Sequence, residues 1–363
     1  MLLWQNGDYM RNMFRLFPLT GAPILSIVLL FTACSRETRR VETPHPTFGI
    51  LIHAGAGSIS KESLKPEREA AVRIKLAEAV MTGHRILQNG GTSIDAVEAT
   101  IRILEDCPLF NAGKGAVFTS EGTNELDACI MDGRTLKAGA VAGVKHIKNP
   151  ISLARLVMEK SPHVMMVAEG AEKFAVEQGI ELVDQKYFFT QERWDSWQRV
   201  RQREEQRDKE QKRPSGTLEQ GIGTERKYGT VGAVALDKAG NLAAATSTGG
   251  TQNKRFGRVG DCPIVGAGTY ANNRTCAVSA TGTGEYFIRL NVAHDISALM
   301  EYRGWTLEQA ANTVIKEKLT KLGGDGGIIA IDRQGRIATP FNTSGMWRAH
   351  VLGPDGKVVV DVF

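Results

Sequence analysis

Tyr228-Gly-Thr-Val-Gly-Ala-Val-Ala-Leu-Asp237 is the stretch that decides the fold of this chain. Residues 231–236 are mostly small or β-branched and carry no charge, as in a buried strand. Residues 237–240 are turn formers, and 241–247 is a second run of small residues, so the two runs predict a β-hairpin. Thr230 therefore stands where a polar segment ends and a buried strand begins.

Further strands and helices are predicted on both sides of this hairpin. The strands after it follow one another across short turns, as in an antiparallel sheet, and helices occur in both halves of the chain. We therefore predict an α+β fold, a four-layer sandwich of two sheets covered by helices. The predicted strands are 49–53, 264–270, 275–280, 327–331 and 357–362, and the predicted helices are 66–91, 92–105, 150–160, 162–179, 285–301 and 306–319.

The composition limits the function. A length of 363 residues with 42% apolar content favours one catalytic domain, or two at most. The net charge of +5 is spread along the chain rather than gathered in one basic block, which argues against a nucleic-acid partner. Five cysteines without paired spacing indicate neither a zinc site nor a disulfide framework.

The N-terminus has the pattern of an export leader. Arg11 and Arg15 precede the apolar run 23–31, and Thr32-Ala-Cys34 resembles a bacterial lipobox. We predict a lipoprotein-like signal peptide over 1–33, a lipidated Cys34, a polar tether over 34–46 and a periplasmic location. A cleaved signal and a signal anchor are the alternatives, although the run is shorter than the roughly 20 residues that span a bilayer.

A polar segment, 189–229, separates the two halves of the chain. Its central part mixes both signs of charge with almost no apolar residues, and Pro214-Ser-Gly and Gly221-Ile-Gly follow. We predict a flexible linker that contributes little to any core. A helical rod of Arg and Glu is the alternative.

A polar linker that ends at Gly229-Thr230 suits a self-cleaving precursor. Glycine allows strained backbone conformations, so the Thr230 hydroxyl can approach the preceding carbonyl. Attack there gives an ester by an N-to-O acyl shift, and water then releases Thr230 as a new amino terminus. An α-amino group with a pKa of roughly 7.7 to 8 can accept the hydroxyl proton, so one residue supplies nucleophile and base. Gly-Thr before a strand is common, and by itself it is weak evidence.

Several longer motifs in register make the interpretation specific. They are the opening stretch, Ile52-His-Ala-Gly-Ala-Gly57, Asn89-Gly-Gly91, Asp95-Ala-Val97, Phe110-Asn-Ala-Gly-Lys-Gly-Ala-Val117, Gly240-Asn-Leu-Ala-Ala-Ala-Thr-Ser-Thr-Gly-Gly250, Gly257-Arg-Val-Gly-Asp261, Gly266-Ala-Gly-Thr-Tyr270 and Thr281-Gly-Thr-Gly-Glu285. In this order they resemble the plant-type L-asparaginase and isoaspartyl peptidase family of N-terminal nucleophile hydrolases, from about Gly49 to the C-terminus without the linker. The resemblance implies the αββα sandwich of that class.

The resemblance also implies how the chain is divided and assembled. Cleavage would give an α subunit, 47–229, and a β subunit, 230–363, which together form one catalytic domain. The two subunits would pair further into an (αβ)₂ heterotetramer, as the family does.

The resemblance assigns roles to individual residues. Thr230 would be the nucleophile, and Thr248 would hold its oxygen. Arg258 would bind the substrate α-carboxylate, for which a planar two-pronged donor suits best, and Asp261 would bind the α-ammonium. Without the family, an Arg and an Asp three residues apart are more often a surface ion pair. Thr281 and Gly282 would form the oxyanion hole, and the remaining substrate-binding positions are Val259, Gly260, Thr283 and Gly284.

Two supporting features are implied in the first half. Asn111 would lie near the Gly229–Thr230 bond. A loop would bind a structural sodium ion through backbone carbonyls, and no cofactor would be needed for catalysis. The matching loop positions are Leu104, Glu105, Cys107, Phe110, Ala112 and Lys114.

The predicted reaction is hydrolysis of β-aspartyl dipeptides and L-asparagine through a β-aspartyl ester on Thr230. Tyr228 and Ala54 depart from the family pattern, which has histidine and glycine there, and both lie at predicted self-cleavage elements. A glycosylasparaginase is one alternative, although it has Asp before the nucleophile. A lipid-anchored binding protein is another, which would keep Arg258 and Asp261 but have no use for Gly229-Thr230.

Overall fold

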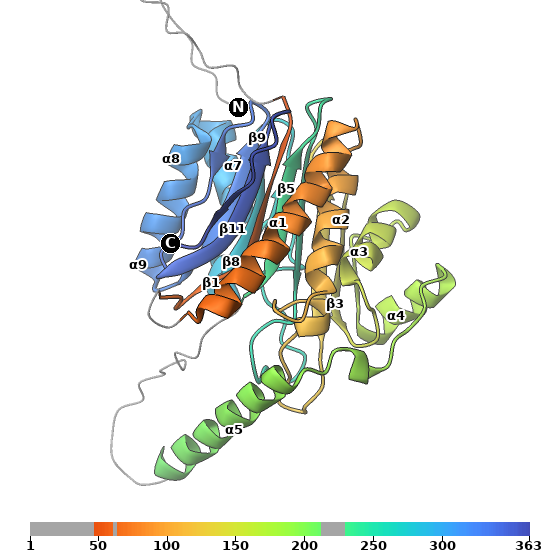
Figure 1. Ribbon diagram of the computed structural model, residues 1–363, viewed down its shortest axis with the longest axis vertical. Coiled ribbons are helices and arrows are strands. Elements are labelled where there is room, and N and C mark those ends of the chain that lie inside the picture. Colours follow the sequence, from red (N-terminus) through yellow and green to blue (C-terminus); the bar gives the residue numbers. More distant parts are fainter. Residues whose placement is uncertain (1–46, 61–63, 212–228) are drawn as a thin grey trace, which may run out of the picture. The chain divides into compact units, whose positions relative to one another are not determined.

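The predicted hairpin is present in the computed structural model, which describes residues 47–60, 64–211 and 229–363 (Figure 1). Strand β5 (Val231–Leu236) pairs antiparallel with β6 (Leu242–Thr248). Ala233 and Ala235 pack in one apolar cluster and Val234 and Leu236 in another, so β5 is buried on both faces. This is why its sequence is apolar at every position.

Two sheets form the centre of the unit Pro44–Phe363. The larger has the order β12-β11-β1-β5-β6-β2-β3-β4, in which only the β3–β4 pair is parallel, and the smaller has the antiparallel order β10-β9-β8-β7. The other strands are β1 (Gly49–Gly57), β2 (Leu126–Asp132), β3 (Ala138–Val144), β4 (Met165–Val167), β7 (Thr269–Ala271), β8 (Cys276–Gly282), β9 (Gly326–Asp332), β10 (Ile337–Ala338), β11 (Gly345–Leu352) and β12 (Val359–Asp361).

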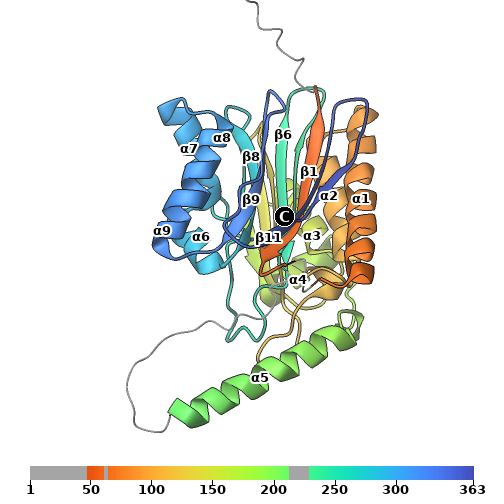
Figure 2. The same cartoon turned by 60° about the vertical axis from the view of Figure 1, so that its left-hand side comes forward.

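Helices cover the outer faces of both sheets (Figure 2). Helices α1 (Pro66–Gln88), α2 (Ser93–Glu105) and α3 (Pro150–Lys160) contact the larger sheet, and α7 (Val292–Arg303) and α8 (Leu307–Asn312) contact the smaller one. Apolar clusters fill the helix–sheet interfaces and the space between the sheets. The unit is therefore α+β, with two sheets and covering helices. The other helices are α4 (Ala168–Glu177), α6 (Gly284–Leu290), α9 (Thr320–Leu322), the 3-10 turns Gly113–Gly115 and Gln185–Tyr187, and the π-helical turn Thr313–Leu319.

The helix boundaries agree with the predicted ones where a capping side chain lies within a few residues of the helix end. Helix α2 ends at Glu105 as predicted, and the Thr92 hydroxyl accepts a hydrogen bond from the Asp95 N–H at 3.2 Å. The predicted helix 285–301 is wrong as one helix: Asn291 has a left-handed backbone (φ 52°), which separates α6 from α7. The predicted helix 162–179 is also too long, because it begins only at Ala168, after β4.

The prediction of a flexible linker is wrong for its first half, because helix α5 (Gln191–Gln211) occupies it. Trp197 is buried, and the Phe118 ring lies 6.1 Å from its ring centroid and 5.2 Å from that of Trp194. These tryptophans anchor a helix that is otherwise charged, so the alternative of a helical rod holds here. Residues 212–228 and the predicted leader and tether, 1–46, lie outside the described residues.

Candidate active site

Thr230 and Thr248 lie side by side at the same end of the hairpin. Thr230 directly precedes β5, Thr248 is the last residue of β6, and the Thr230 hydroxyl donates to Thr248 Oγ1 at 3.1 Å. The same Thr248 oxygen accepts the Gly250 N–H at 2.9 Å. The structure thus brings together the predicted nucleophile and the residue predicted to hold its oxygen.

Gly229 is enclosed between β1 and β8. A Cβ on Gly55, which has a left-handed backbone (φ +108°), would lie 2.4 Å from the Gly229 nitrogen. A Cβ on Gly229 itself would lie 2.7 Å from Thr281 Oγ1. Side chains larger than hydrogen are therefore excluded both at Gly55 and at Gly229. Ala54, one of the departures, is buried in β1 directly before Gly55.

Thr281 presents a buried hydroxyl beside this peptide. The residue is 1% exposed, and within the described part of the chain its Oγ1 has no hydrogen-bond partner. Leaving such a group unpaired costs roughly 1 to 3 kcal/mol, so this donor is held free next to Gly229. Gly282 follows in β8, where a Cβ would lie 2.4 Å from the Asp325 carbonyl oxygen.

Arg258 and Asp261 converge on the start of α6. A Cβ on Gly284 would lie 2.8 Å from Asp261 Oδ1 and 2.9 Å from Arg258 Nη2, and one on Gly260 would lie 2.8 Å from Arg258 Nη1. The glycines predicted as substrate-binding positions therefore leave room for the two charged side chains. Val259 connects Arg258 to Gly260 in this loop.

The ion pair that holds Arg258 involves Glu285, which sequence reasoning assigned only to the start of a helix. Arg258 Nε donates to Glu285 Oε1 at 2.9 Å, and Nη2 donates to Oε2 at 3.0 Å. Burial raises the pKa of Asp261 to about 7, against the lowering effect of nearby Arg258. Asp261 Oδ2 is buried with no hydrogen-bond partner among the described residues. The Asp261 carboxyl group, an acceptor, and the Arg258 guanidinium, a cation, thus lie together near the start of α6.

Thr283 and Asn111 form hydrogen bonds that support loops of the site. Thr283 donates its hydroxyl to an Asp325 carboxylate oxygen and its N–H to the Asp325 carbonyl at 3.0 Å. Asn111 Nδ2 donates to the Gly250 carbonyl at 2.7 Å, and the Asn111 carbonyl accepts the Gly249 N–H at 3.1 Å. Asn111 therefore fixes the turn that follows Thr248.

The loop predicted to bind sodium is tightly folded on its glycines. A Cβ on Gly113 would lie 2.3 Å from the Glu105 carbonyl oxygen, and one on Gly115 would lie 2.0 Å from the Phe110 carbonyl oxygen. The carbonyls of Leu104, Cys107 and Ala112, which are also predicted ligands, accept N–H groups within the loop. At Lys114, the last predicted position, the side-chain ammonium lies 5.0 Å from the Tyr187 ring centroid. In the described ranges, no cluster of three His, Cys, Asp or Glu side chains suits a metal.

Glu105, at the start of this loop, connects it to the hairpin through its side chain. The carboxyl accepts the Ser247 hydroxyl at 2.6 Å and the Ile151 N–H at 3.1 Å. Burial raises the pKa of Glu105 to about 8.

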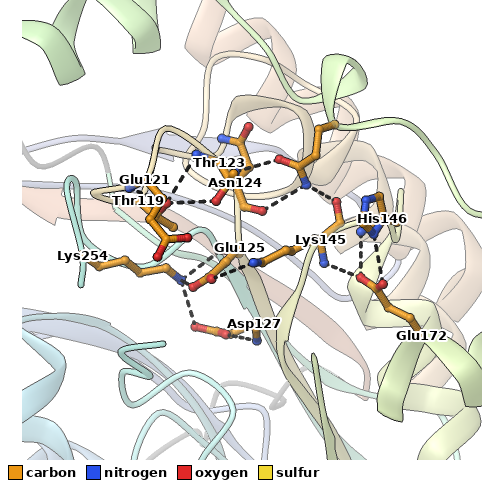
Figure 3. Close-up of polar contacts among 12 residues, drawn as sticks. Thr119, Glu121, Thr123, Asn124, Glu125, Asp127, Lys145, His146, Glu172 and Lys254 are labelled. Carbon is orange, nitrogen blue, oxygen red and sulfur yellow. Dashed lines mark hydrogen bonds and ion pairs between the residues drawn. The ribbon is translucent and has the colours of Figure 1, made fainter. Parts of the chain in front are cut away.

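Figure 3 shows a row of buried and half-buried charges that was missed from the sequence. It lies next to the pair Arg258 and Asp261, which we call the clamp, because the Cys262 thiol that follows Asp261 donates to the Asp127 carbonyl at 3.5 Å. Asp127 faces Thr248 across the β2–β6 ladder, and its Oδ1 accepts the Gly143 N–H at 2.8 Å. Lys254 is buried, and its ammonium donates to the Glu125 carbonyl at 3.0 Å and lies 4.0 Å from Asp127 Oδ2. A lone aspartate in the apolar run 126–131 is the signal that could have pointed to this row.

Comparisons with known proteins agree with this arrangement. The asparaginase family profile matches residues 46–360. An isoaspartyl peptidase of Escherichia coli K12 is 54% identical over 303 residues, which cover 83% of this chain and 91% of that protein. An isoaspartyl peptidase/L-asparaginase of Bos taurus is 41% identical over 310 residues, covering 85% of this chain and 94% of the relative.

The interpretation of the N-terminus needs correction. The family match begins at residue 46, and the similar enzymes of Escherichia coli and Salmonella typhimurium carry names that mention neither lipid nor export. Across the described ranges, no helix is long and apolar enough to cross a membrane. The predictions of a signal peptide, a lipid anchor at Cys34 and a periplasmic lipoprotein are corrected accordingly: the comparisons support only the enzyme domain from residue 46 onward. A short apolar run before a cysteine is too brief a pattern to specify a leader.

The matches extend over most of the chain and include every loop around Thr230. They cover the hairpin, the Arg258–Asp261 loop and the turn from β8 into α6, whose contacts are those described above. The chain therefore belongs to the asparaginase family.

Proposed function

We propose that this hydrolase cleaves β-aspartyl (isoaspartyl) dipeptides and L-asparagine. The relatives' names support the two substrates. The observation that carries the proposal is the Thr230 hydroxyl at 3.1 Å from Thr248 Oγ1, with a guanidinium and a carboxyl close by at Gly284. A substrate with a free α-amino and α-carboxylate group suits such a charged pair.

Self-cleavage at Gly229–Thr230 would prepare the nucleophile. The enclosure of Gly229 by Gly55 and Thr281 supports a peptide that is held in one position next to the Thr281 hydroxyl. The products would be an α subunit, 47–229, and a β subunit, 230–363, within one four-layer αββα domain. The three apolar clusters between helices, sheets and helices support this layering.

The reaction would run through an ester. The free α-amino group of Thr230 takes the hydroxyl proton, and Oγ1 attacks the β-carbonyl carbon of the substrate. The Thr281 hydroxyl and the Gly282 N–H stabilise the oxyanion, as donors of this kind typically do by roughly 2.7 to 4 kcal/mol. The amine leaves with a proton, and water then hydrolyses the β-aspartyl ester to restore Thr230.

The clamp would determine which amides react. Arg258 binds the α-carboxylate and Asp261 the α-ammonium, while Val259, Gly260, Thr283 and Gly284 form the surrounding loops. Glu285 keeps the guanidinium oriented through its two contacts.

Three further features complete the proposal. The loop 104–114 would bind a structural sodium ion through backbone carbonyls, which suit a hard cation, and its glycines allow the backbone to pack closely against the Glu105 and Phe110 carbonyls. Catalysis would need no cofactor. Two αβ pairs would assemble into an (αβ)₂ heterotetramer.

The test compares Thr230→Ala and Thr230→Ser with the unaltered protein. Aspartate release from L-asparagine and from a β-aspartyl dipeptide is measured by chromatography. We expect Thr230→Ala to lose at least about 10³-fold in rate and Thr230→Ser, which keeps a hydroxyl and an α-amino group, to retain measurable turnover. Full activity of Thr230→Ala would refute the proposal.

A further inference from the structure

Helix α5 contacts the loop that carries Arg258. This loop, residues 251–258, connects the turn after Thr248 to the clamp. Because α5 comes from the segment directly before the proposed cleavage site, its contacts connect the end of the α subunit to a substrate-binding residue of the β subunit.

Aromatic packing fixes the first half of α5. Trp194 and Trp197 have ring centroids 4.6 Å apart, and both contact Phe118. Trp197 also donates its indole N–H to Asn253 Oδ1 at 3.1 Å, and Arg193 Nε donates to the Gly115 carbonyl at 2.7 Å. The helix therefore has a defined position relative to the loop.

Glu204 extends this contact about two turns beyond Trp197 along α5. Its Oε2 accepts Asn253 Nδ2 at 2.8 Å and Arg255 Nη2 at 2.8 Å. One carboxylate thus binds two side chains of the loop, one neutral and one charged. Hydrogen bonds to an ionised acceptor are about twice as strong as neutral ones.

The opposite face of the loop is fixed from inside the protein. The side chain of Lys254, between the two residues that Glu204 binds, is buried against Glu125 and Asp127 (Figure 3). The backbone carbonyl of Lys254 accepts the Ser120 N–H at 2.9 Å. Residues 253–255 are therefore held on two sides, by α5 and by the charges next to the clamp.

A tight backbone turn couples the position of Arg255 to that of Arg258. The Arg258 N–H donates to the Arg255 carbonyl at 3.1 Å, closing a turn in which Phe256 and Gly257 both have left-handed backbones (φ 54° and 74°). Phe256 is a non-glycine residue in this region, a conformation that needs support from its neighbours. Anchoring Arg255 at one end of this turn therefore constrains where Arg258 lies at the other.

We propose that α5 is a positioning element for the substrate clamp, with Glu204 as the positioning residue that acts on Arg258 through Asn253 and Arg255. The inference rests on the proposed function. It further implies that α5 stays bound to the loop after cleavage at Gly229, so the end of the α subunit contributes to substrate affinity.

The test measures steady-state kinetics of the full chain with Glu204→Ala, Glu204→Gln and, as matched control, Glu205→Ala on the next position of α5. Glu204→Ala should raise KM about three- to tenfold, the factor for losing roughly 0.7 to 1.4 kcal/mol of binding, with kcat and self-cleavage unchanged. The rise should be equal for L-asparagine and a β-aspartyl dipeptide, because both present the same α-carboxylate to Arg258.

The remaining variants separate positioning from folding. Glu204→Gln keeps an acceptor for Asn253 and should recover part of the lost affinity, and Glu205→Ala should match the unaltered protein. An unchanged KM in Glu204→Ala, or a rise confined to dipeptides, would overturn the inference. If the unaltered protein turns over neither substrate, the proposed function fails instead, which is a separate result.

Discussion

Thr281→Val should lower activity and raise stability at the same time. Valine has the shape of threonine without the hydroxyl, and the Thr281 hydroxyl is buried without a partner among the described residues. Removing an unpaired buried hydroxyl should stabilise the fold by up to roughly 1 to 3 kcal/mol. Removing an oxyanion donor should cost roughly 2.7 to 4 kcal/mol of transition-state stabilisation, or about 10² to 10³ in kcat.

The two effects need separate assays. Turnover of L-asparagine is measured per cleaved molecule, with the cleaved fraction determined on denaturing gels. Stability is measured by urea unfolding in a Thr230→Ala background, so that every chain stays intact. The control is Thr275→Val, directly before the strand β8 that contains Thr281, because the Thr275 hydroxyl is hydrogen-bonded to the Ser297 hydroxyl at 2.6 Å.

The control should show the opposite pattern. Thr275→Val breaks that bond and leaves Ser297 unpaired, so it should lower the urea midpoint and leave kcat unchanged. A Thr281→Val enzyme with full kcat would refute the oxyanion role. A lower urea midpoint for Thr281→Val would show that its hydroxyl is bonded in the folded protein.

Three other predictions follow from the burial of single groups. Because burial raises the pKa of Asp261 to about 7 from an ordinary 3.8, its carboxylate forms only as the pH rises through that value. KM for L-asparagine should therefore fall between about pH 6 and pH 8, and Asp261→Asn should abolish this trend. Gly55→Ala should block or greatly slow self-cleavage, as seen on gels, because the new Cβ would lie 2.4 Å from the Gly229 nitrogen. Glu105 has its pKa raised from 4.5 to about 8, so the folded state binds more protons than the unfolded state in that window. Stability should fall there with rising pH, by at most about 1.4 kcal/mol per unit, and Glu105→Gln should flatten the urea-unfolding profile.

Each of these has a result that contradicts it. A KM that does not change between pH 6 and pH 8 would mean that Asp261 is already ionised in the acidic range. Normal cleavage of Gly55→Ala would show that Gly229 is not confined as described. A pH slope that is the same with and without Glu105→Gln would assign it to other groups.

Local signals in the sequence predicted the elements that local interactions determine. The hairpin around Asp237 and the start of α2 at Thr92 depend on turn and cap residues that are adjacent in sequence, and both are confirmed. A flexible linker was favoured over the helix α5 because charged residues dominate the composition of 189–229, and the aromatic packing of Trp194 and Trp197 depends on distant residues.

The contacts between distant loops could not be predicted from spacing. Family motifs placed Arg258 and Asp261 together, yet the partner of the guanidinium is Glu285, which lies 27 positions away in another element. Lys254 and Asp127 lie outside the family motifs, and their contact depends on how β2 pairs with β6. Such pairs depend on tertiary packing rather than on periodicity.

The central claim is that Thr230 becomes an amino terminus. Purified protein should be resolved by denaturing electrophoresis and the smaller fragment sequenced from its N-terminus. If the chain is cleaved before Thr230, we expect a fragment that begins Thr-Val-Gly-Ala-Val and is absent from Thr230→Ala. An active enzyme that remains a single chain with Thr230 internal would contradict it.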